Sequence, residues 1–314
     1  MLTSIRLIVA PYHAGIPDLR VGGGPRHLLA HGLVSKLERF APVNFSNIAP
    51  VDEFEGDIGK TFEVMRRISR AVSVASSENA FPIILSGNCN ATAAAVAGLN
   101  DANPANDLSV LWFDAHDDLD TPEIHTSGYL DGMAASMMCG TSWQALSQTM
   151  PGHQPLPLER VSFIGVRHIS DSKKDYMKKS NLRTIWGNAS SRVDYRGEVE
   201  KLLAESHDSR VPCHIHLDAD VLDDSLGRAN EWPSPGGIMA DELYAIMETI
   251  PFRVMPTSLT VCSYDPRLEG GDTVARLLVQ AIEVVVRGVN FTWSRAEDEQ
   301  LMHITTAADT STVG

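Results

Sequence analysis

The sequence has few aromatic residues, no cluster of positive charge and no long hydrophobic run. Of its 314 residues 6% are aromatic, and its formal net charge at pH 7 is −14. Because such an acidic chain would repel phosphate groups, we expect no nucleic-acid partner. No apolar run reaches membrane-spanning length, and the first ten residues lack the apolar core and cleavage pattern of a signal peptide. We therefore expect a cytoplasmic protein with no membrane partner.

Cysteine is scarce, and its spacing gives no sign of a disulfide framework. The four cysteines form no C-x-x-C pair and lie in mainly apolar stretches, which is typical of reduced thiols. Internal repeats and long Gly/Ser linkers are also missing, so nothing marks a domain boundary. We expect one domain over residues 1–302 and a flexible polar tail over residues 303–314.

Short apolar runs alternate with helical patterns along the chain. The runs that predict strands are Ile5–Ala10, Val43–Phe45, Phe81–Leu85, Leu108–Phe113, Val161–Gly165, Arg183–Trp186, His214–Leu217 and Ser258–Val261. The segments that predict helices are Arg26–Phe40, Thr61–Ser76, Ala91–Leu99, Gly132–Cys139, Val193–Glu205, Asp241–Thr249 and Thr273–Arg287. This alternation predicts a three-layer α/β/α domain with a mostly parallel eight-stranded sheet. Residues 141–159 are expected to run over the surface.

Two acidic motifs follow predicted strands. Leu108–Phe113 runs into Asp114–Asp118 (D-A-H-D-D), and His214–Leu217 runs into Asp218–Asp220 (D-A-D). Ligands bind at the carboxyl ends of parallel strands, where these carboxylates would repel one another without cations. Oxygen ligands with an imidazole suit Mn²⁺ or a similar ion. A single D-x-D is better explained as a turn or helix cap, but the two motifs together indicate a metal cluster.

A third candidate, Cys89, follows the strand Phe81–Leu85 in the segment Ser86–Ala91 (S-G-N-C-N-A). A thiolate at this position would complete the cluster. Cysteine is also a common core residue, so on its own Cys89 is better explained by packing.

The order of these motifs resembles the arginase/agmatinase/formiminoglutamase (ureohydrolase) superfamily over nearly the whole chain. The matching pieces are Gly22–Pro25, Ser86–Ala91, Asp114–Asp118, Ser127–Met133, Gly165–Arg167, Asp218–Asp223, Pro235–Gly237 and Tyr264–Pro266. The resemblance implies an arginase-like hydrolase with two divalent metal ions, a small-molecule substrate and a homo-oligomeric assembly.

The resemblance also implies the metal ligands. Asp114 and Asp218 would bridge the two ions, Asp118 would bind the first, and His116 and Asp220 would bind the second. Cys89 stands where the family usually has a His on the first metal, and its Gly-Asn-Cys-Asn setting is similar to the branch containing N-hydroxyarginine amidinohydrolase. We expect Mn²⁺, with Zn²⁺ or Fe²⁺ possible beside a thiolate. Cys89 is expected to alkylate readily without metal and to be protected with it.

Departures from the family pattern fall where the substrate would bind. Asp131 replaces a His that assists proton transfer, and Ser263 replaces a guanidinium-binding Glu. Asp120 and Tyr129 replace amides that hold the amino acid carboxylate, and Ser170 replaces an Asp that holds its amino group. We predict Asp118, Asp131 and Ser263 as catalytic residues. The predicted substrate contacts are Asp120, Ser127, Tyr129, Ser170 and Trp232.

These departures make free arginine a poor candidate substrate. Loss of the guanidinium-facing Glu removes a charge-assisted pair of about 1.5–3 kcal/mol, and Asp120 would repel a carboxylate. We predict hydrolysis of a C–N bond in a modified guanidine, an amidine or a linear amide by metal-bridging hydroxide. The alternatives are an amide deformylase or deacetylase, and a catalytically silent binding or regulatory protein. We expect His13, His125 and His168 to be structural.

Overall fold

The computed structural model describes the backbone of residues 1–310 except 53, 105–106, 126 and 206–210, and side chains through residue 295. Its centre is an eight-stranded sheet in the order β4-β1-β5-β10-β9-β6-β7-β8, in which every neighbouring pair is parallel. The strands are β1 (Ser4–Ala10), β4 (Val43–Asn47), β5 (Ala80–Ser86), β6 (Ser109–Phe113), β7 (Val161–Val166), β8 (Arg183–Trp186), β9 (Pro212–Asp218) and β10 (Met255–Cys262). All eight predicted strands and the predicted sheet are confirmed.

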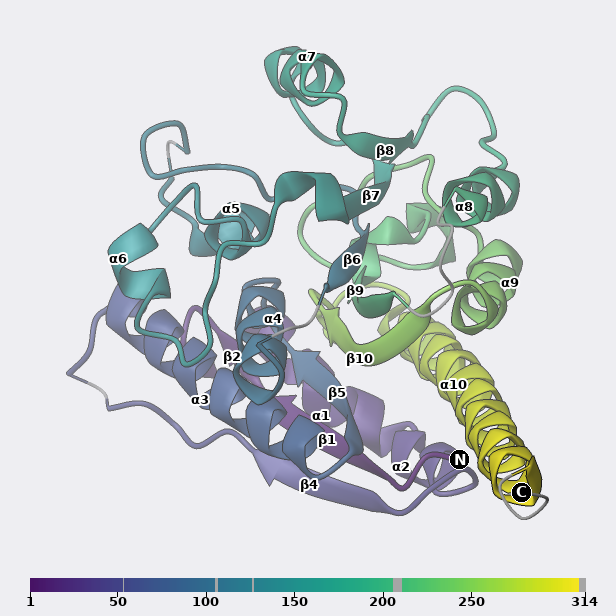
Figure 1. Ribbon diagram of the computed structural model, residues 1–314. Helices are drawn as coiled ribbons and strands as arrows, with labels where there is room; N and C mark the ends of the chain where they lie inside the picture. Colours follow the sequence, from purple (N-terminus) through teal and green to yellow (C-terminus); the bar gives the residue numbers. More distant parts are fainter. Residues whose placement is uncertain (53, 105–106, 126, 206–210, 311–314) are drawn as a thin grey trace.

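Helices cover both faces of the sheet, as the three-layer prediction requires (Figure 1). One face is covered by α3 (Asp57–Ser77), α4 (Ala91–Ala102) and α5 (Ala134–Met138). The other is covered by α1 (Gly24–Ala30), α2 (Leu33–Leu37), α8 (Tyr195–Ala204), α9 (Ala240–Thr249) and α10 (Gly271–Thr310). The smaller elements are β2 (Tyr12–His13), β3 (Ile16–Pro17), α6 (Gln144–Ser147), α7 (Asp171–Lys179), η1 (Arg20–Gly23), η2 (Leu130–Met133), η3 (Leu158–Arg160), η4 (Ala219–Val221), η5 (Asp224–Leu226) and η6 (Ile250–Phe252).

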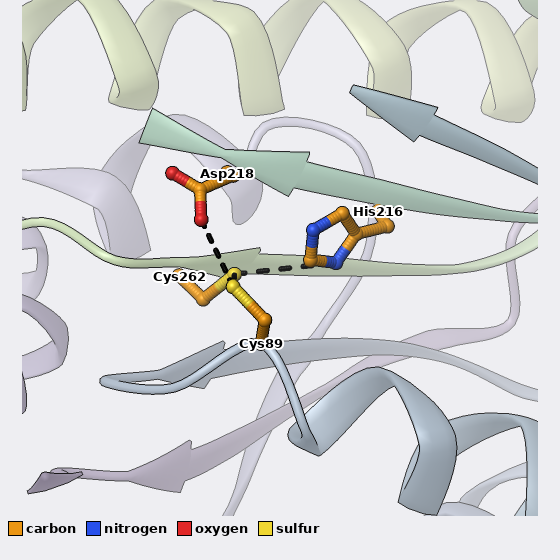
Figure 2. A group of neighbouring side chains, drawn as sticks. All are labelled: Cys89, His216, Asp218 and Cys262. Carbon is orange, nitrogen blue, oxygen red and sulfur yellow. Dashed lines mark hydrogen bonds between the residues drawn. The ribbon is translucent and has the colours of Figure 1, made fainter. Parts of the chain in front are cut away.

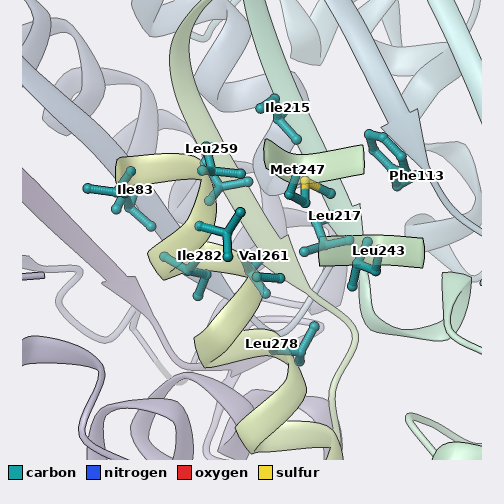
Figure 3. Close-up of a cluster of buried hydrophobic side chains, with 14 of the residues drawn as sticks. Ile83, Phe113, Ile215, Leu217, Leu243, Met247, Leu259, Val261, Leu278 and Ile282 are labelled. Atoms are coloured by element: carbon teal, nitrogen blue, oxygen red, sulfur yellow. The ribbon is translucent and has the colours of Figure 1, made fainter. Parts of the chain in front are cut away.

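The core consists of two apolar layers, one on each face of the sheet. Successive strand residues alternate between them: Ile83 packs toward α10 and its neighbour Ile84 toward α3 and α4. Figure 3 shows the first layer, where Leu217 and Val261 meet Leu278 of α10. Burial on both faces explains why the central strands read as continuous apolar runs.

The structure differs from the sequence prediction in three internal segments. The predicted helix 26–40 is divided into α1 and α2 because Gly32 adopts a left-handed conformation, with φ 81°. Helix α7 was not predicted, since its polar sequence buries only Met177 and shows no apolar period. The segment 141–159 is packed rather than merely superficial, because it contains α6 and buries Met150 and Leu156.

The C-terminal helix is longer than predicted. Helix α10 continues to Thr310, so most of the segment 303–314 that was expected to be a flexible tail is helical, and residues 311–314 lie outside the described chain. Among the described residues, no helix has the length and apolarity needed to cross a membrane.

Candidate metal centre and active site

The candidate site lies at the carboxyl ends of four adjacent strands, β5, β10, β9 and β6. A cavity of about 1090 Å³ opens there. Its lining includes the predicted residues Cys89, His116, Asp118, Asp120, Ser127, Tyr129, Asp131, Ser170, Asp218, Asp220, Trp232 and Ser263. Asp114 lies just beneath this lining, where it accepts a hydrogen bond of 3.0 Å from the Trp112 indole. The topology therefore brings every predicted site residue to one place.

His116 joins the two acidic motifs. Its Nδ1 lies 3.3 Å from Asp114 Oδ1 and 3.2 Å from Asp220 Oδ2. Burial disfavours the charged imidazole, but Asp220 and Asp114 raise the pKa of His116 well above its ordinary value. Burial also opposes ionisation of Asp220, yet His116, the Asn230 amide and the Ala115 backbone N–H together lower the pKa of Asp220. A positive charge is therefore stabilised between these two carboxylates.

A second group consists of Cys89, Asp114 and Asp118. Their ligand atoms lie within 4.8 Å of one another, and all three side chains are buried. Asp118 adopts a left-handed backbone conformation with φ 48°, which is uncommon for a residue with a side chain and is concentrated at functional sites. Its Oδ2 is buried without a hydrogen-bond partner. The group thus has an unsatisfied acceptor where a cation would bind.

A third group consists of Cys89, His216, Asp218 and Cys262 (Figure 2). Two of these residues, His216 and Cys262, were not predicted from the sequence. Cys89 Sγ lies 2.9 Å from Asp218 Oδ2 and 3.6 Å from Cys262 Sγ. Cys262 is also 4.0 Å from His216 Nδ1. The period-two alternation of β9 was an available signal for His216, because it places residues 216 and 218 on the same face. Cys262, the last residue of β10, carried no motif.

The electrostatics of the buried carboxylates in these groups favour bound cations. Burial, followed by repulsion from Asp114, raises the pKa of Asp118 well above its ordinary value. Burial and the charges of Asp220 and Asp114 do the same to the pKa of Asp218. Buried carboxylates that resist ionisation together are stabilised as anions by divalent ions. The carboxylates, the imidazole and the Asp118 oxygen without a partner fit the two-metal centre that the family resemblance implied.

The expected reactivity of Cys89 needs correction. Burial raises its pKa, the contact with the Cys262 thiol favours the neutral form of Cys89 and adds to the effect, and the carboxylates of Asp131 and Asp218 raise the pKa further, well above the ordinary value. Without cations the thiol is therefore protonated, and its side chain is buried. We now expect slow alkylation in the metal-free protein, because the thiolate is the reactive form.

Asp131 holds the loop that carries Cys89. Its carboxylate accepts hydrogen bonds from Asn88 Nδ2 at 2.6 Å, from the backbone N–H groups of Cys89 and Asn90, and from the Tyr129 hydroxyl at 3.3 Å. Burial raises the pKa of Asp131 to about 6, although these hydrogen bonds favour its charged form. The residue predicted as a proton carrier is thus also a structural anchor for Cys89.

Most predicted substrate contacts are engaged with protein partners. Asp120 Oδ1 lies 2.7 Å from Lys173 Nζ, which also contacts Asp117 Oδ1 at 2.8 Å. The charge of Asp120 is therefore partly neutralised, which weakens the repulsion of a carboxylate expected from sequence. The Ser170 hydroxyl caps α7 by accepting from the Lys173 N–H at 3.4 Å.

Two further predicted substrate contacts, Ser127 and Trp232, and the predicted catalytic residue Ser263 differ in exposure. The Ser127 hydroxyl lies 3.0 Å from His125 Nδ1, and the Ser263 hydroxyl lies 3.1 Å from Cys89 Sγ. Trp232 is 52% exposed on the cavity lining. Trp232 is therefore free to contact a ligand, whereas Ser263 is held against the Cys89 thiol.

The three histidines expected to be structural all line the cavity. His168 Nδ1 lies 3.0 Å from His116 Nε2. His13 Nδ1 is buried without a hydrogen-bond partner, and burial lowers the pKa of His13. Their place on the lining is compatible with the structural role expected from the sequence, which stays a prediction.

Arg167, from the Gly-x-Arg motif, holds the loop after β9. Its guanidinium donates hydrogen bonds to the backbone carbonyls of Asp220 at 2.7 Å, Leu222 at 3.1 Å and Ser234 at 2.8 Å. Three carbonyls from two segments are thus fixed by one side chain, so Arg167 positions Asp220 without touching its carboxylate.

Comparisons with known proteins agree with this fold. The model of the arginase family matches residues 4–286. Arginase from Bacillus caldovelox is 25% identical over 287 residues, covering 88% of this chain and 95% of that protein. The structure of Entamoeba histolytica arginase in complex with L-ornithine superposes with a TM-score of 0.79 at 20% identity, covering 91% and 99% of the two chains. Proclavaminate amidino hydrolase from Streptomyces clavuligerus gives 0.67 at 18% identity, with 92% of each chain covered.

Proposed function

The chain belongs to the arginase family, hydrolases that act on non-peptide C–N bonds, and from this premise we propose that it cleaves a guanidine or amidine that carries no free carboxylate. Free arginine would then be a poor substrate. The observation that carries this proposal is the strongly acidic cavity above the strand ends.

Acidic side chains dominate the lining of that cavity. It contains nine Asp or Glu residues against one Arg and one Lys. Lys173 is engaged by Asp117 and Asp120, and Arg20 lies 3.1 Å from Glu231, so neither cation is left to bind a substrate anion. Two divalent ions would offset four negative charges, which leaves the cavity acidic. A cationic guanidinium or amidinium is attracted there, and a carboxylate is repelled.

We assign the metal ligands as the family resemblance implied. Asp114 and Asp218 would bridge the two ions. Cys89 and Asp118 complete the first site, while His116 and Asp220 complete the second. The hard oxygen donors favour Mn²⁺, and the Cys89 thiolate would shift the first site toward Zn²⁺ or Fe²⁺.

When bound, the two ions would supply a water activated for attack near neutral pH. The protein then has to place the substrate carbon and handle the proton of the leaving amine. We propose Asp131 as the proton carrier, since it replaces the family His and lines the cavity beside Tyr129 and Asn88. Trp232 is proposed to cover the apolar part of the substrate, because its exposed ring lines the cavity.

The test is a panel of substrates assayed with the metal-loaded enzyme. We expect kcat/KM for agmatine, the decarboxylated form of arginine, to exceed that for arginine by at least about tenfold, a difference of about 1.4 kcal/mol in transition-state binding. Efficient urea release from arginine would contradict the proposal. Turnover of N-formyl or N-acetyl amides alone would establish the rival hydrolytic reaction, and no turnover at all would identify a silent binding protein.

A charge-neutralising variant makes the test more specific. Asp120→Asn leaves Lys173 with Asp117 as its acidic partner, so the cavity should repel the arginine carboxylate less strongly. The ratio of kcat/KM for agmatine to that for arginine should then fall by several-fold. Asp175→Asn, an exposed change on α7, is the matched control and should leave the preference unchanged. If Asp120→Asn behaves like the control, the charge of Asp120 does not set specificity.

A further inference from the structure

A second group of metal-ligand side chains lies outside the active-site cavity. It consists of His27 and His31, one helical turn apart at α1, and Asp272 in the first turn of α10. Asp272 Oδ1 lies 3.3 Å from His27 Nε2 and 3.4 Å from His31 Nε2. None of the three lines the cavity of the candidate active site.

The hydrogen bonds of the two rings determine which nitrogens carry protons. His31 Nδ1 lies 2.9 Å from the His27 carbonyl, which can only accept, so His31 Nδ1 carries a hydrogen. His27 Nδ1 lies 2.7 Å from the Tyr264 hydroxyl, whose own hydrogen is donated to the Gly271 carbonyl at 2.8 Å. His27 Nδ1 must therefore donate to Tyr264. In the neutral form of both rings, the Nε2 atoms present lone pairs.

The Nε2 lone pairs of His27 and His31 both face the Asp272 carboxylate oxygen. These three atoms repel one another unless a cation lies between them. Burial, followed by the charge of His31, lowers the pKa of His27, while Asp272 opposes this to a smaller extent. The charged form of the His27 ring is thus disfavoured. A hydrogen bond from the opposite ring nitrogen to a carbonyl or hydroxyl is the arrangement that orients histidines which bind metals in proteins.

We propose that His27, His31 and Asp272 bind a divalent transition-metal ion such as Zn²⁺, separate from the two ions of the active site. Two imidazole nitrogens and a carboxylate oxygen suit Zn²⁺, with water at the fourth position. The side chains are 28%, 21% and 70% exposed, so solvent reaches the site. The bound ion would tie α1 to the start of α10.

The packing around the proposed site holds α1 and α10 in the positions that bring its three ligands together. A side chain at Gly24, the first residue of α1, would come within 2.4 Å of the Tyr264 carbonyl, so glycine allows α1 to approach the end of β10. Tyr264 is fully buried and contacts both His27 and Gly271. One side chain therefore orients a ligand on α1 and contacts the residue that precedes Asp272.

Equilibrium dialysis of the manganese-loaded enzyme against Zn²⁺ tests this proposal, with total Mn and Zn counted by plasma mass spectrometry. Counting both metals makes the result independent of any exchange in the active site. We expect His31→Asn and Asp272→Asn to bind one ion fewer per chain than the wild type, and Zn²⁺ to raise the wild-type Tm more than theirs. His153→Asn, which lies outside the described metal-ligand groups, is the control and should match the wild type.

Equal metal content in the wild type and His31→Asn would overturn the proposal. A loss of the same size in His153→Asn would also overturn it, since binding would then be general to surface histidines. Circular dichroism of the metal-free variants establishes that they fold, so that a lower metal count reports the site itself. Because no active-site residue is altered, failure of this site would leave the proposed hydrolase function intact.

Discussion

Cys89 is the residue that most clearly separates this site from the pattern it resembles. It belongs to two metal-ligand groups, one with Asp114 and Asp118 and one with Asp218, His216 and Cys262. Cys262 belongs only to the second and is a buried neighbour rather than our assigned ligand. Asp131 holds the Cys89 backbone in this position, so the protein keeps the thiol directed at the carboxylates.

Replacing Cys89 should therefore change metal binding in a way that depends on the new side chain. We expect Cys89→Ala to weaken the first metal site by at least about tenfold, because only carboxylates remain to hold it. Cys89→His should retain the metal, since imidazole is the usual family ligand. The measurement is metal affinity by competition with a chelator.

The neighbouring thiol provides the matched control for this experiment. Cys262→Ala removes a buried sulfur 3.6 Å away and should lower stability while leaving the metal affinity near that of the wild type. If Cys89→Ala keeps full affinity and Cys262→Ala loses it, the ligand assignment is reversed.

At the scale of elements, the site depends on loops that approach one another closely. Gly87, in the turn after β5, illustrates this: a Cβ there would lie 2.1 Å from the Tyr12 carbonyl and 2.9 Å from the Gly22 Cα. Only glycine allows the loop bearing Cys89 to pass beneath the β2 segment.

Gly87→Ala is expected to displace that loop. Both contacts are with backbone, so neither can move aside cheaply, and we expect a loss of about 1–3 kcal/mol of unfolding free energy together with weaker metal binding. Urea unfolding and metal analysis measure the two effects. Gly56→Ala is the control, since no atom lies within 4 Å of the added Cβ. Equal effects of the two changes would show that the close approach is unimportant.

Arg167 is the subject of a second prediction at the scale of elements. Arg167→Lys keeps the charge but loses the planar set of donors that reaches the Asp220, Leu222 and Ser234 carbonyls, so we expect a cost of about 2–4 kcal/mol in unfolding free energy. Thermal or urea unfolding is the measurement. Arg183→Lys, an exposed change on β8, should cost little. A stability loss no greater than that of the control would mean that Arg167 does not hold these loops.

The sequence predicted the elements that have an apolar period, and it located the candidate ligands that follow a strand. The eight strands and the two acidic motifs belong to this kind, because apolar patterning and strand ends can be recognised locally. Helix α7 was missed because it buries one residue, and the contact of His168 with His116 was missed because it depends on how two loops meet. The pairing of Asp120 with Lys173 was missed for the same reason.

At the scale of the whole molecule, the parallel sheet explains why residues as distant as Cys89 and Ser263 share one site. The order β5-β10-β9-β6 brings four strand ends together, and each contributes one loop to the cavity. Several carboxylates, among them Asp118, Asp218 and Asp220, are buried there. Their mutual repulsion would oppose folding in the absence of cations, so metal binding should stabilise the protein as well as activate it.

Removal of the metal should therefore lower stability. We expect dialysis against a chelator to reduce the Tm by several degrees, with recovery on adding Mn²⁺, because ions that bind only the native state stabilise it by mass action. The Tm of Asp218→Asn should respond less to the chelator than that of the wild type, since one charged bridging ligand is already gone. A wild-type Tm unaffected by the chelator would show that the carboxylates are accommodated without cations.

The central claim, a two-metal centre at the strand ends, is tested most directly by counting metal in the His31→Asn protein. This variant lacks a ligand of the separate site proposed at His27, His31 and Asp272. After reconstitution with Mn²⁺ and dialysis, plasma mass spectrometry should find close to two ions per chain. Asp218→Asn in the same background should lose both, while Asp175→Asn should keep both. Finding no bound metal after reconstitution with Mn²⁺, Zn²⁺ or Fe²⁺ would contradict the account.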